Sequence, residues 1–375
     1  MLDVLAVGML DPAQVPGGLD RYRVDLDRAL AARGHRVAEV CAAPAPSGVG
    51  QYAAGGPLAT LWGARLATGR LLRERGRRWT LVAAHFALPA AAALTLPRAA
   101  ELPWVVHFHG PWADEARVEA GGRGAPAGLA LRAGLEQHVY RRARAVIALS
   151  RAFAAVAVDR YGVAPARVSV IPPGVDLERF RPGDRGGARR RWGLAPETRV
   201  LLTVRRLARR MGLDVLLEAA RHVPDGDWQL LIAGGGELGP ELAERVRGLG
   251  LAARVRLLGR VADADLPGLY QTADAFVLPS VCLEGFGMVI PEALASGVPV
   301  LAFAVGGIPE ALEGLPGCLL PSADARGLAA ALTGVVSGGY PLPPPQAVRA
   351  LAERRFAWEA VAARVERVYL EACGS

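Results

Sequence analysis

Short apolar runs alternate with helix-like segments along almost the whole chain, and this alternation most limits how it can fold. The first cycle has an apolar run at residues 2–10, a Gly- and Pro-rich turn, a helical pattern at 19–33 and a second apolar run at 36–42. Strands that are joined by a helix pack side by side as a parallel sheet. The pattern therefore predicts an α/β fold.

The alternation is interrupted once, at Pro172, Pro173 and Gly174, after which the polar, Gly-rich stretch 181–190 follows. Before this break we expect a helix at 129–144 and strands at 79–84, 104–108, 145–149 and 168–171. After it we expect strands at 200–204, 228–233, 255–258, 275–278 and 298–303, and helices at 212–222, after Pro240, from about 291 and at 356–372. A chain of 375 residues is too long for one ordinary core. We therefore predict two domains of similar size, residues 1–175 and 176–355.

All 44 residues counted as Lys or Arg are Arg, because no Lys occurs in the chain. A chain without Lys cannot bind pyridoxal phosphate as a Schiff base, and it cannot supply the Lys of a P-loop. The Arg residues are spread over the whole length, without a basic tail or interleaved aromatic residues. The net charge of +8 therefore does not predict a nucleic-acid partner.

The four Cys residues lie far apart, with no pair spaced for zinc or for a redox dithiol, which favours a reduced, cytoplasmic protein. The N-terminus lacks the basic region of a signal peptide. The most apolar stretch, residues 81–96, is too short and too broken to cross a membrane. One alternative stays open: the Arg-rich segments 65–78 and 129–144 contact the inner face of an anionic membrane peripherally, rather than being merely solvated.

Glu284 and Glu292 stand eight residues apart on either side of a Gly-bearing loop, in the segment EGFGMVIPE that follows an expected strand. The amides of Gly287, Met288 and Val289 are expected at the start of a helix, where they have no partner within it. Such amides and the positive end of the helix dipole favour a phosphate group. Carboxylates suit sugar hydroxyls, so Glu292 is a candidate for a ribose diol and Glu284 for the group on the far phosphate.

This segment resembles the E-x7-E motif of the family 4 retaining glycosyltransferases, which have the GT-B fold. Other segments resemble the family in the same order: Gly17-Gly18 its N-terminal glycine loop, His109-Gly110 its acceptor-side histidine, and residues 203–214, 232–236, 265–274 and 306–310 its donor-side loops. The resemblance covers nearly the whole chain. It implies two Rossmann-like parallel-sheet domains facing a central cleft, with an acceptor-binding first domain, a nucleotide-sugar-binding second domain and a final helix, 356–375, that packs back on the first.

The resemblance also implies roles for single residues. Arg206 would neutralise the diphosphate, Glu284 would bind the donor sugar and Glu292 the ribose. Gly17 and Gly18 would let the backbone approach the phosphate. His109 would contact the donor sugar or orient the acceptor, whereas His107, earlier on the same strand, is expected to be structural. The family's same-face attack, in which the leaving phosphate helps to deprotonate the acceptor, needs no protein nucleophile, metal or bound cofactor.

The chain departs from the family in the segment that holds the phosphate. The family's Lys aligns with Met211, which leaves Arg209 and Arg210 as candidate replacements. The family's Gly is replaced by Arg205, so both Arg205 and Arg206 are candidates for the phosphate. The phosphate-binding groups are therefore the least fixed part of the predicted site.

The expected reaction moves a sugar from a nucleotide diphosphate donor to a hydroxyl of a small molecule, a lipid or a glycan. A UDP-sugar is the default donor, with GDP- and ADP-sugars next. Two alternatives remain: a sugar-nucleotide 2-epimerase of the same fold, against which the E-x7-E segment argues, and a non-catalytic sugar-nucleotide-binding module, which Met211 keeps open. A glycogen-type phosphorylase fits the fold, but the missing Lys removes its cofactor.

Overall fold

The computed structural model describes residues 1–10, 18–43, 46, 48–121, 126–320 and 322–374. The chain divides into two compact units, unit 1 with residues 1–174 and 358–375, and unit 2 with residues 175–357. It passes from one unit to the other between Gly174 and Val175, and returns between Ala357 and Trp358. The boundary expected from the sequence lay one residue after the first of these crossings.

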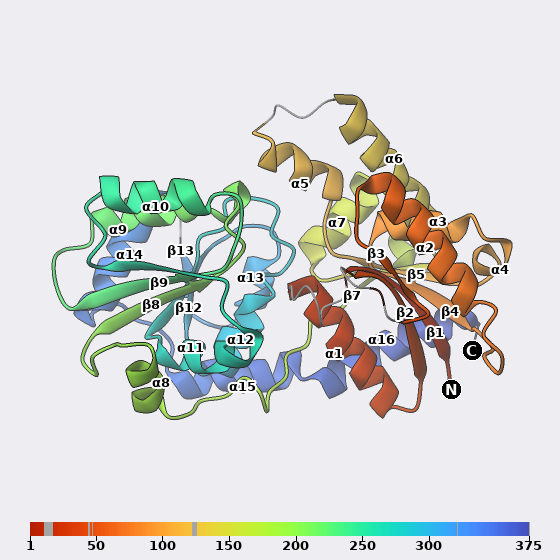
Figure 1. Cartoon of the computed structure of the whole chain (residues 1–375). Helices are drawn as coiled ribbons and strands as arrows, with labels where there is room; N and C mark the ends of the chain where they lie inside the picture. Colours follow the sequence, from red (N-terminus) through yellow and green to blue (C-terminus); the bar gives the residue numbers. More distant parts are fainter. Residues whose placement is uncertain (11–17, 44–45, 47, 122–125, 321, 375) are drawn as a thin grey trace. The chain divides into compact units, whose positions relative to one another are not determined.

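Unit 1 contains a parallel sheet with the strand order β3-β2-β1-β4-β5-β6-β7 (Figure 1). The strands are β1 (Asp3–Leu10), β2 (Arg36–Ala43), β3 (Gln51–Ala53), β4 (Leu81–Ala84), β5 (Trp104–Phe108), β6 (Ala145–Ala148) and β7 (Val168–Val170). The helices are α1 (Gly18–Ala32), α2 (Pro57–Leu71), α3 (Ala87–Leu94), α4 (Pro97–Ala100), α5 (Trp112–Glu119), α6 (Pro126–Arg142), α7 (Arg151–Asp159) and α16 (Trp358–Cys373), with a 3₁₀ turn at Pro165–Arg167.

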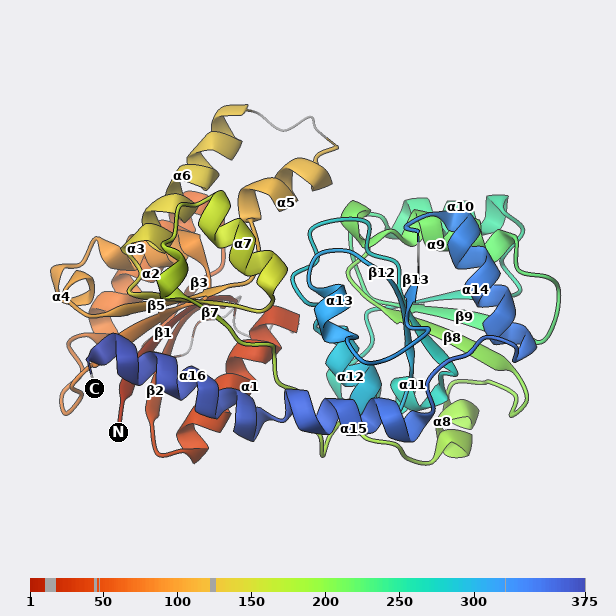
Figure 2. The ribbon, with the colours of Figure 1, turned by 180° about the vertical axis from the view of Figure 1, so that it is seen from behind.

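The core of unit 1 lies on both faces of this sheet. β4 and β5 are buried along their whole length, as expected for central parallel strands that read as continuous apolar runs. Helices α2, α3 and α6 pack together on one face, and α1 and α16 pack together on the other (Figures 1 and 2). The order reverses between β1 and β4, and the carboxyl ends of these two strands and of β5 lie at one edge of the sheet.

Unit 2 contains a second parallel sheet, with the strand order β10-β9-β8-β11-β12-β13. The strands are β8 (Arg199–Val204), β9 (Trp228–Ala233), β10 (Val255–Gly259), β11 (Ala275–Leu278), β12 (Val300–Phe303) and β13 (Leu319–Leu320). The helices are α8 (Arg185–Arg191), α9 (Leu213–Arg221), α10 (Gly239–Gly248), α11 (Leu266–Thr272), α12 (Val289–Ala295), α13 (Ile308–Ala311), α14 (Ala325–Ser337) and α15 (Pro345–Phe356), with 3₁₀ turns at Arg209–Met211 and Asp263–Asp265.

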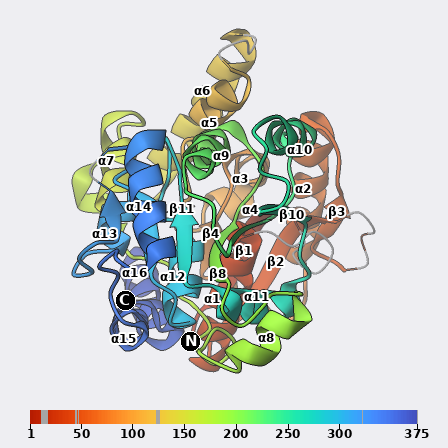
Figure 3. The ribbon, with the colours of Figure 1, turned by 90° about the vertical axis from the view of Figure 1, so that its left-hand side faces the viewer.

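The two faces of the sheet in unit 2 are covered by different helices. α9 packs against α10 and α14, and Figure 3 shows α9 and α14 side by side over the strands. α11 packs on α8, and α12 on α15, at the other face (Figures 1 and 2). The strand order reverses between β8 and β11, which places the loops after these central strands next to each other.

The last helical segment is shorter than expected. The sequence predicted one helix from residue 356, but α15 ends at Phe356 and α16 begins at Trp358. Ala357 between them has extended backbone angles, φ −61° and ψ 129°, and pairs with Val175 in a parallel bridge. The sequence therefore placed the start of the last helix two residues early, and it did not predict α15.

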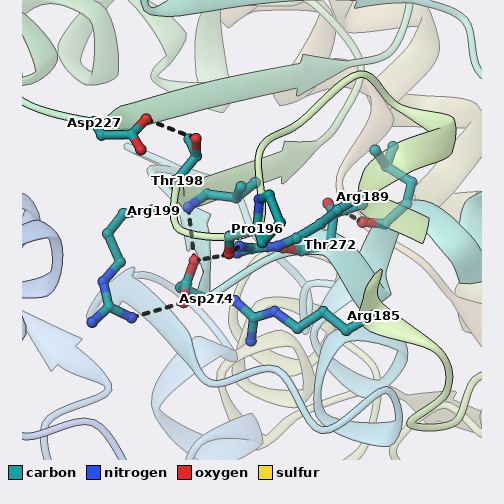
Figure 4. A network of polar contacts seen from close by, with 10 residues as sticks. Arg185, Arg189, Pro196, Thr198, Arg199, Asp227, Thr272 and Asp274 are labelled. Atoms are coloured by element: carbon teal, nitrogen blue, oxygen red, sulfur yellow. Dashed lines mark hydrogen bonds and ion pairs between the residues drawn. The ribbon is translucent and has the colours of Figure 1, made fainter. Parts of the chain in front are cut away.

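A helix that was not predicted, α8, forms in the polar, Gly-rich stretch at the domain boundary. The Asp184 side chain caps α8 by accepting a hydrogen bond of 2.9 Å from the amide of Gly187. The helix is then held by Asp274, which lies just before β11 and accepts hydrogen bonds from Arg185 at 2.6 Å and Arg189 at 2.9 Å (Figure 4). Asp274 also binds Arg199 at 3.1 Å and the amide of Val200 at 2.7 Å. Asp274 therefore ties α8 to the amino end of the sheet.

Candidate active site

The loops after β8 and β11 bring together an arginine and a glutamate at the carboxyl edge of the sheet in unit 2. Arg205 directly follows β8, and Glu284 lies in the loop after β11. Because these strands are neighbours at the reversal of strand order, their loops flank the crevice where open α/β sheets bind ligands.

The Glu284 carboxylate is held by two donors. Nη2 of Arg205 and the hydroxyl of Ser280 both donate to Oε2 of Glu284, each at 2.7 Å. Burial alone would raise the pKa of Glu284, but the Arg205 guanidinium, the Ser280 hydroxyl and the nearby charge of Arg210 outweigh it and lower that pKa. Glu284 is therefore an ionised acceptor at neutral pH, suited to binding hydroxyl groups and not to donating a proton.

Tight main-chain contacts fix the positions of these two side chains. Gly212 has φ 68°, and a Cβ there would lie 1.8 Å from the carbonyl oxygen of Pro279, at the start of the Glu284 loop. The amide of Val281 donates to the carbonyl of Arg210 at 3.1 Å, and the amide of Gly307 donates to that of Glu284 at 3.0 Å. The segment after β8 and the loops after β11 and β12 are therefore fastened to each other.

The residue before Glu284 is conformationally strained. Leu283 has φ 51°, the only positive φ among the non-glycine residues that the structure describes. Such a conformation costs about 1–3 kcal/mol and persists where the surroundings enforce it, which is common at ligand sites. Nη1 of Arg210 donates to the carbonyl oxygen of Leu283 at 3.2 Å, so one of the two candidate replacements for the family's Lys supports this loop.

The second acidic residue of the motif has a neutral partner. Glu292 lies in the first turn of α12 and is buried, and its Oε2 accepts a hydrogen bond of 2.7 Å from the Tyr270 hydroxyl. Tyr270 belongs to α11 and is itself fully buried. From the sequence, Glu292 and the segment 265–274, which contains Tyr270, resemble separate parts of the family pattern, and this contact was not predicted.

The structure separates the two arginines that the sequence left as candidates for the phosphate. Arg205 is hydrogen-bonded to Glu284, with 5% of its side chain exposed, whereas Arg206 is exposed. The amides expected to bind phosphate lie where α12 begins: Gly287 has φ 75°, Met288 precedes the helix and Val289 is its first residue. The helix is seven residues long.

The glycines at residues 234–236 are explained by packing within unit 2. A Cβ on Gly234 would lie 1.7 Å from the carbonyl oxygen of Arg205, and one on Gly236 would lie 2.3 Å from that of Leu207. The amide of Leu207 donates to the carbonyl of Gly235 at 2.9 Å. These glycines therefore let the loop after β9 lie against the segment that carries Arg205.

In unit 1, three histidines lie at the carboxyl edge of the sheet, and of these His85 and His107 are buried and His109 is half-buried. His85 follows β4, His107 lies in β5 and His109 follows it, and their rings are nearly parallel, with centroids of His85 and His107 at 4.3 Å. Nδ1 of His85 is 3.2 Å from Nε2 of His109. His107 bonds the hydroxyls of Tyr22 at 3.1 Å and Tyr369 at 2.8 Å, which ties β5 to α1 and α16.

Burial keeps these histidines neutral. It lowers the pKa of His109 to about 3 and the pKa values of His85 and His107 well below their usual range. A neutral His109 can orient a hydroxyl by a hydrogen bond but carries no charge at neutral pH. The sequence analysis singled out His109, whereas its contact with His85 comes from neighbouring strands and was missed.

Other expected features are only partly open to description. Gly18 is exposed and begins α1, and Gly17 lies outside the described residues. Among the described residues, no group of three or more His, Cys, Asp or Glu side chains is arranged to hold a metal ion. Nor does any helix in the described ranges have the length and apolar character needed to cross a membrane.

Two family models match the chain, one in each half. The model described as Glycosyltransferase Family 4 matches residues 16–179, and the model described as Glycosyl transferases group 1 matches residues 198–337. The second segment contains Arg205, Glu284 and Glu292. The first contains the three histidines.

Similar proteins come from several bacteria. The D-inositol 3-phosphate glycosyltransferase 2 of Catenulispora acidiphila is 38% identical over 248 residues, which are 62% of this chain and 57% of that protein. The D-inositol 3-phosphate glycosyltransferase of Geodermatophilus obscurus is 39% identical over 214 residues, which are 54% of this chain and 47% of that one. The chain thus spans about half the length of the curated relatives it matches.

Solved structures agree with the fold over the whole chain. Sucrose-phosphate synthase from Thermosynechococcus elongatus has a TM-score of 0.84 at 24% identity and covers 99% of both chains. Anabaena HepE in complex with UDP-glucose has a TM-score of 0.75 at 21% identity and covers 99% of this chain and 100% of its own. With matching models on both halves and this architecture, the chain belongs to glycosyltransferase family 4 and has the GT-B fold.

Proposed function

We propose that this chain is a retaining glycosyltransferase, which moves a sugar from a nucleotide diphosphate donor to a hydroxyl group. One observation carries the proposal: an ionised glutamate and a buried arginine share a hydrogen bond at the reversal of strand order in unit 2. This is where an open α/β sheet binds its ligand. The carboxylate can accept hydrogen bonds from hydroxyl groups, and the guanidinium can donate them to a phosphate, as the adjoining sugar and diphosphate of a nucleotide sugar require.

Unit 2, which contains the whole of the expected domain 176–355, is the proposed donor domain. Glu284 accepts hydrogen bonds from the donor sugar, and Glu292, held by Tyr270, accepts them from the ribose diol. The amides of Gly287, Met288 and Val289 face the diphosphate. The resemblance to the family assigns the cation to Arg206, beside which Arg205 and Arg210 supply further positive charge.

The chemistry needs these charges because the leaving group is an anion. The bond between the anomeric carbon and the diphosphate oxygen breaks, and both of its electrons go to that oxygen. The acceptor oxygen bonds to the anomeric carbon on the same face, and its proton passes to the departing phosphate. A fixed positive group aimed at the developing charge is typically worth about 3–4 kcal/mol of the barrier. No side chain acts as the nucleophile in this scheme.

Unit 1, expected as residues 1–175 with the final helix, is the proposed acceptor domain. Neutral His109, backed by His85, is placed to orient a hydroxyl, and the backbone at Gly17 and Gly18 is proposed to approach the donor phosphate. Several relatives are named as D-inositol 3-phosphate glycosyltransferases, at 36–40% identity over part of their length. We therefore propose an inositol phosphate as the first small-molecule acceptor to test.

A peripheral contact with an anionic membrane is proposed as an additional property. Leu58, Trp62 and Leu66 recur every fourth residue of α2, and they are 73%, 66% and 58% exposed. Exposed Arg70 continues this row, and α2 contains no acidic residue. An apolar row with flanking Arg residues suits the boundary between lipid headgroups and acyl chains. Co-sedimentation with vesicles that contain anionic lipid tests this proposal. We expect the unaltered chain to sediment with the vesicles and Trp62→Ser to remain in the supernatant.

The sugar-nucleotide 2-epimerase and the non-catalytic binding module remain the alternatives. A transfer assay with UDP-, GDP- and ADP-sugars and an inositol phosphate separates them from the proposal. Glycosylated product supports transfer, an epimerised sugar nucleotide supports the epimerase, and tight binding without any product supports the binding module.

Nucleotide binding is the first experiment. The melting temperature of the full chain is measured with UDP, GDP, ADP and TDP, with and without a chelator. A nucleotide at 100 times its Kd stabilises the folded state by about 2.7 kcal/mol, which raises the melting temperature by a few degrees. The absence of a shift with every nucleotide would contradict the proposal. A shift that the chelator removes would contradict only the claim of metal independence.

A further inference from the structure

The Arg205 guanidinium is buried with most of its hydrogen-bonding capacity unused. Only Nη2 has partners, the Glu284 carboxylate and the Met211 sulfur. Nε and Nη1 are buried, and neither finds an acceptor in the part of the chain that the structure describes. Three N–H bonds of a charged group, one on Nε and two on Nη1, are thus withdrawn from water without compensation.

Such an arrangement is unfavourable unless a ligand completes it. Buried polar groups are almost always hydrogen-bonded, and a charged donor without an acceptor is among the most costly exceptions. The adjacent main chain is held rigidly by Gly212, Gly234 and Gly306, where a Cβ would lie within about 2 Å of a neighbouring carbonyl oxygen. The fold therefore holds the guanidinium in place and provides no acceptor for Nε and Nη1 among the described residues.

The local charge selects an anion for this place. Arg205 and Arg210 carry two positive charges, and Arg210 lies close enough to act on both Arg205 and Glu284. Glu284 forms an ion pair with Arg205. Oxyanions with several non-bridging oxygens, such as a diphosphate, match three N–H bonds that point in different directions better than a single carboxylate does.

We propose that Arg205, not Arg206, is the guanidinium that binds the diphosphate, and that this site binds inorganic pyrophosphate without a nucleotide or a sugar. The ligand class rests on the proposed function. Glu284 then does more than bind the sugar. Its negative charge orients Arg205 and lowers the affinity of the site for the anion. Arg205 then binds the phosphate in place of the family's Lys, whose position is occupied by Met211.

Calorimetric titration of the full chain with inorganic pyrophosphate tests this assignment. We expect Arg205→Gln to weaken binding at least tenfold, with a distinctly smaller loss in Arg206→Gln, which removes the same charge one residue away. Arg247→Gln, an exposed change in α10, controls for net charge and is expected to bind as the unaltered chain does. Retained binding in Arg205→Gln, or a larger loss in Arg206→Gln, would overturn the proposal.

Two further variants separate binding from folding. Glu284→Gln keeps an acceptor for Arg205 but removes the negative charge, so pyrophosphate should bind at least threefold more tightly. Arg205→Gln combined with Glu284→Gln removes both buried charges, and we expect it to fold, as its melting temperature will show, without binding pyrophosphate. Weaker binding in Glu284→Gln, or retained binding in the double variant, would contradict the proposal.

Measuring UDP binding alongside pyrophosphate binding distinguishes a failure of this proposal from a failure of the proposed function. A chain that binds UDP but not pyrophosphate rules out the self-sufficient site and leaves glycosyl transfer standing. A chain that binds pyrophosphate on Arg205 but none of the nucleotides supports the anion site and contradicts the proposed function.

Discussion

Two arginines in unit 2 are equally buried, yet their surroundings differ sharply. Arg189 and Arg205 each have 5% of the side chain exposed, and each pairs with an acidic residue. All three nitrogens of Arg189 have acceptors, in Asp274, the carbonyl of Thr272 and the carbonyl of Pro196 (Figure 4). Among the residues that the structure describes, only Nη2 of Arg205 has hydrogen-bond partners.

The two pairs lie at opposite ends of one sheet. Asp274 precedes β11 at its amino end, and Glu284 follows it at its carboxyl end. A complete set of hydrogen bonds identifies Arg189 as part of the scaffold, since nothing there awaits a ligand. The incomplete set on Arg205 identifies a binding group. Burial alone does not distinguish the two, but the hydrogen-bond inventory does.

The largest expected effect is on sugar transfer. Arg205→Gln should lower kcat about 10²- to 10³-fold, because a preorganised positive group at the leaving oxygen is removed. Arg205→Lys should recover part of this loss, since it keeps the charge but fewer donors. Steady-state kinetics with a nucleotide sugar measure both, and Arg247→Gln is the control. If kcat of Arg205→Gln were close to that of the unaltered chain, Arg205 would not be a binding group that differs in function from Arg189.

Stability should respond to the other arginine. Arg189→Gln should lower the free energy of unfolding by about 2–3 kcal/mol, because two carbonyls and Asp274 lose a buried charged donor. Urea unfolding measures this change. Arg185→Gln removes a partner of the same Asp274 whose side chain is 46% exposed, and it should cost less than about 1 kcal/mol. Equal effects of the two substitutions would show that the complete hydrogen-bond set of Arg189 is not stabilising.

Glu292 tests whether the carboxyl edge as a whole binds the donor. Glu292→Gln should weaken UDP binding about tenfold, because a charge-assisted hydrogen bond to the ribose is worth about 1.5 kcal/mol or more. Tyr270→Phe leaves the carboxylate in place and should weaken it less. Calorimetric titration with UDP compares them. If UDP binds Glu292→Gln and the unaltered chain equally, the ribose lies elsewhere.

Acid stability offers the smallest and most graded comparison. Burial would raise the pKa of Asp274, but the Val200 amide and the guanidiniums of Arg185 and Arg189 outweigh it and lower that pKa, and the pKa of Glu284 is lowered as well. Both carboxylates therefore stabilise the fold above their unfolded pKa values of about 4. This stabilisation is lost as the pH falls through the lower folded values, because the unfolded chain binds protons first.

The two carboxylates should contribute unequally to this acid limb. Asp274→Asn should flatten the dependence of the unfolding free energy on pH below about 4 more than Glu284→Gln does. The reason is that Asp274 faces three guanidiniums and an amide, whereas Glu284 faces Arg205, Ser280 and the field of Arg210. Urea unfolding at several pH values checks the order. If Glu284→Gln flattened the pH dependence of the unfolding free energy more than Asp274→Asn does, the expected order would be wrong.

Much of the fold follows from the sequence pattern. The bounds of β5, β9 and β11 were predicted to the residue, because buried parallel strands form continuous apolar runs between polar or glycine punctuation. The break at Ala357 and the helix α8 were missed. Both depend on contacts with distant residues, Val175 in one case and Asp274 in the other.

The candidate site was predicted in its types of residue but not in its contacts. The two glutamates and His109 could be proposed from the sequence because motif spacing and strand ends are visible in it. The sequence could not decide between Arg205 and Arg206. Adjacent residues after a strand point in different directions, and only tertiary packing determines which one faces the site. The contacts of Ser280 with Glu284 and of His85 with His109 are likewise set by how the loops meet.

A crystal structure of the chain with a bound nucleotide diphosphate sugar would show which guanidinium binds the diphosphate. We expect diphosphate oxygens within about 3 Å of Nε or Nη1 of Arg205. The sugar hydroxyls should then bind Glu284 and the ribose should bind Glu292. A diphosphate held by Arg206, or a donor bound away from the carboxyl edge of the sheet in unit 2, would contradict these expectations.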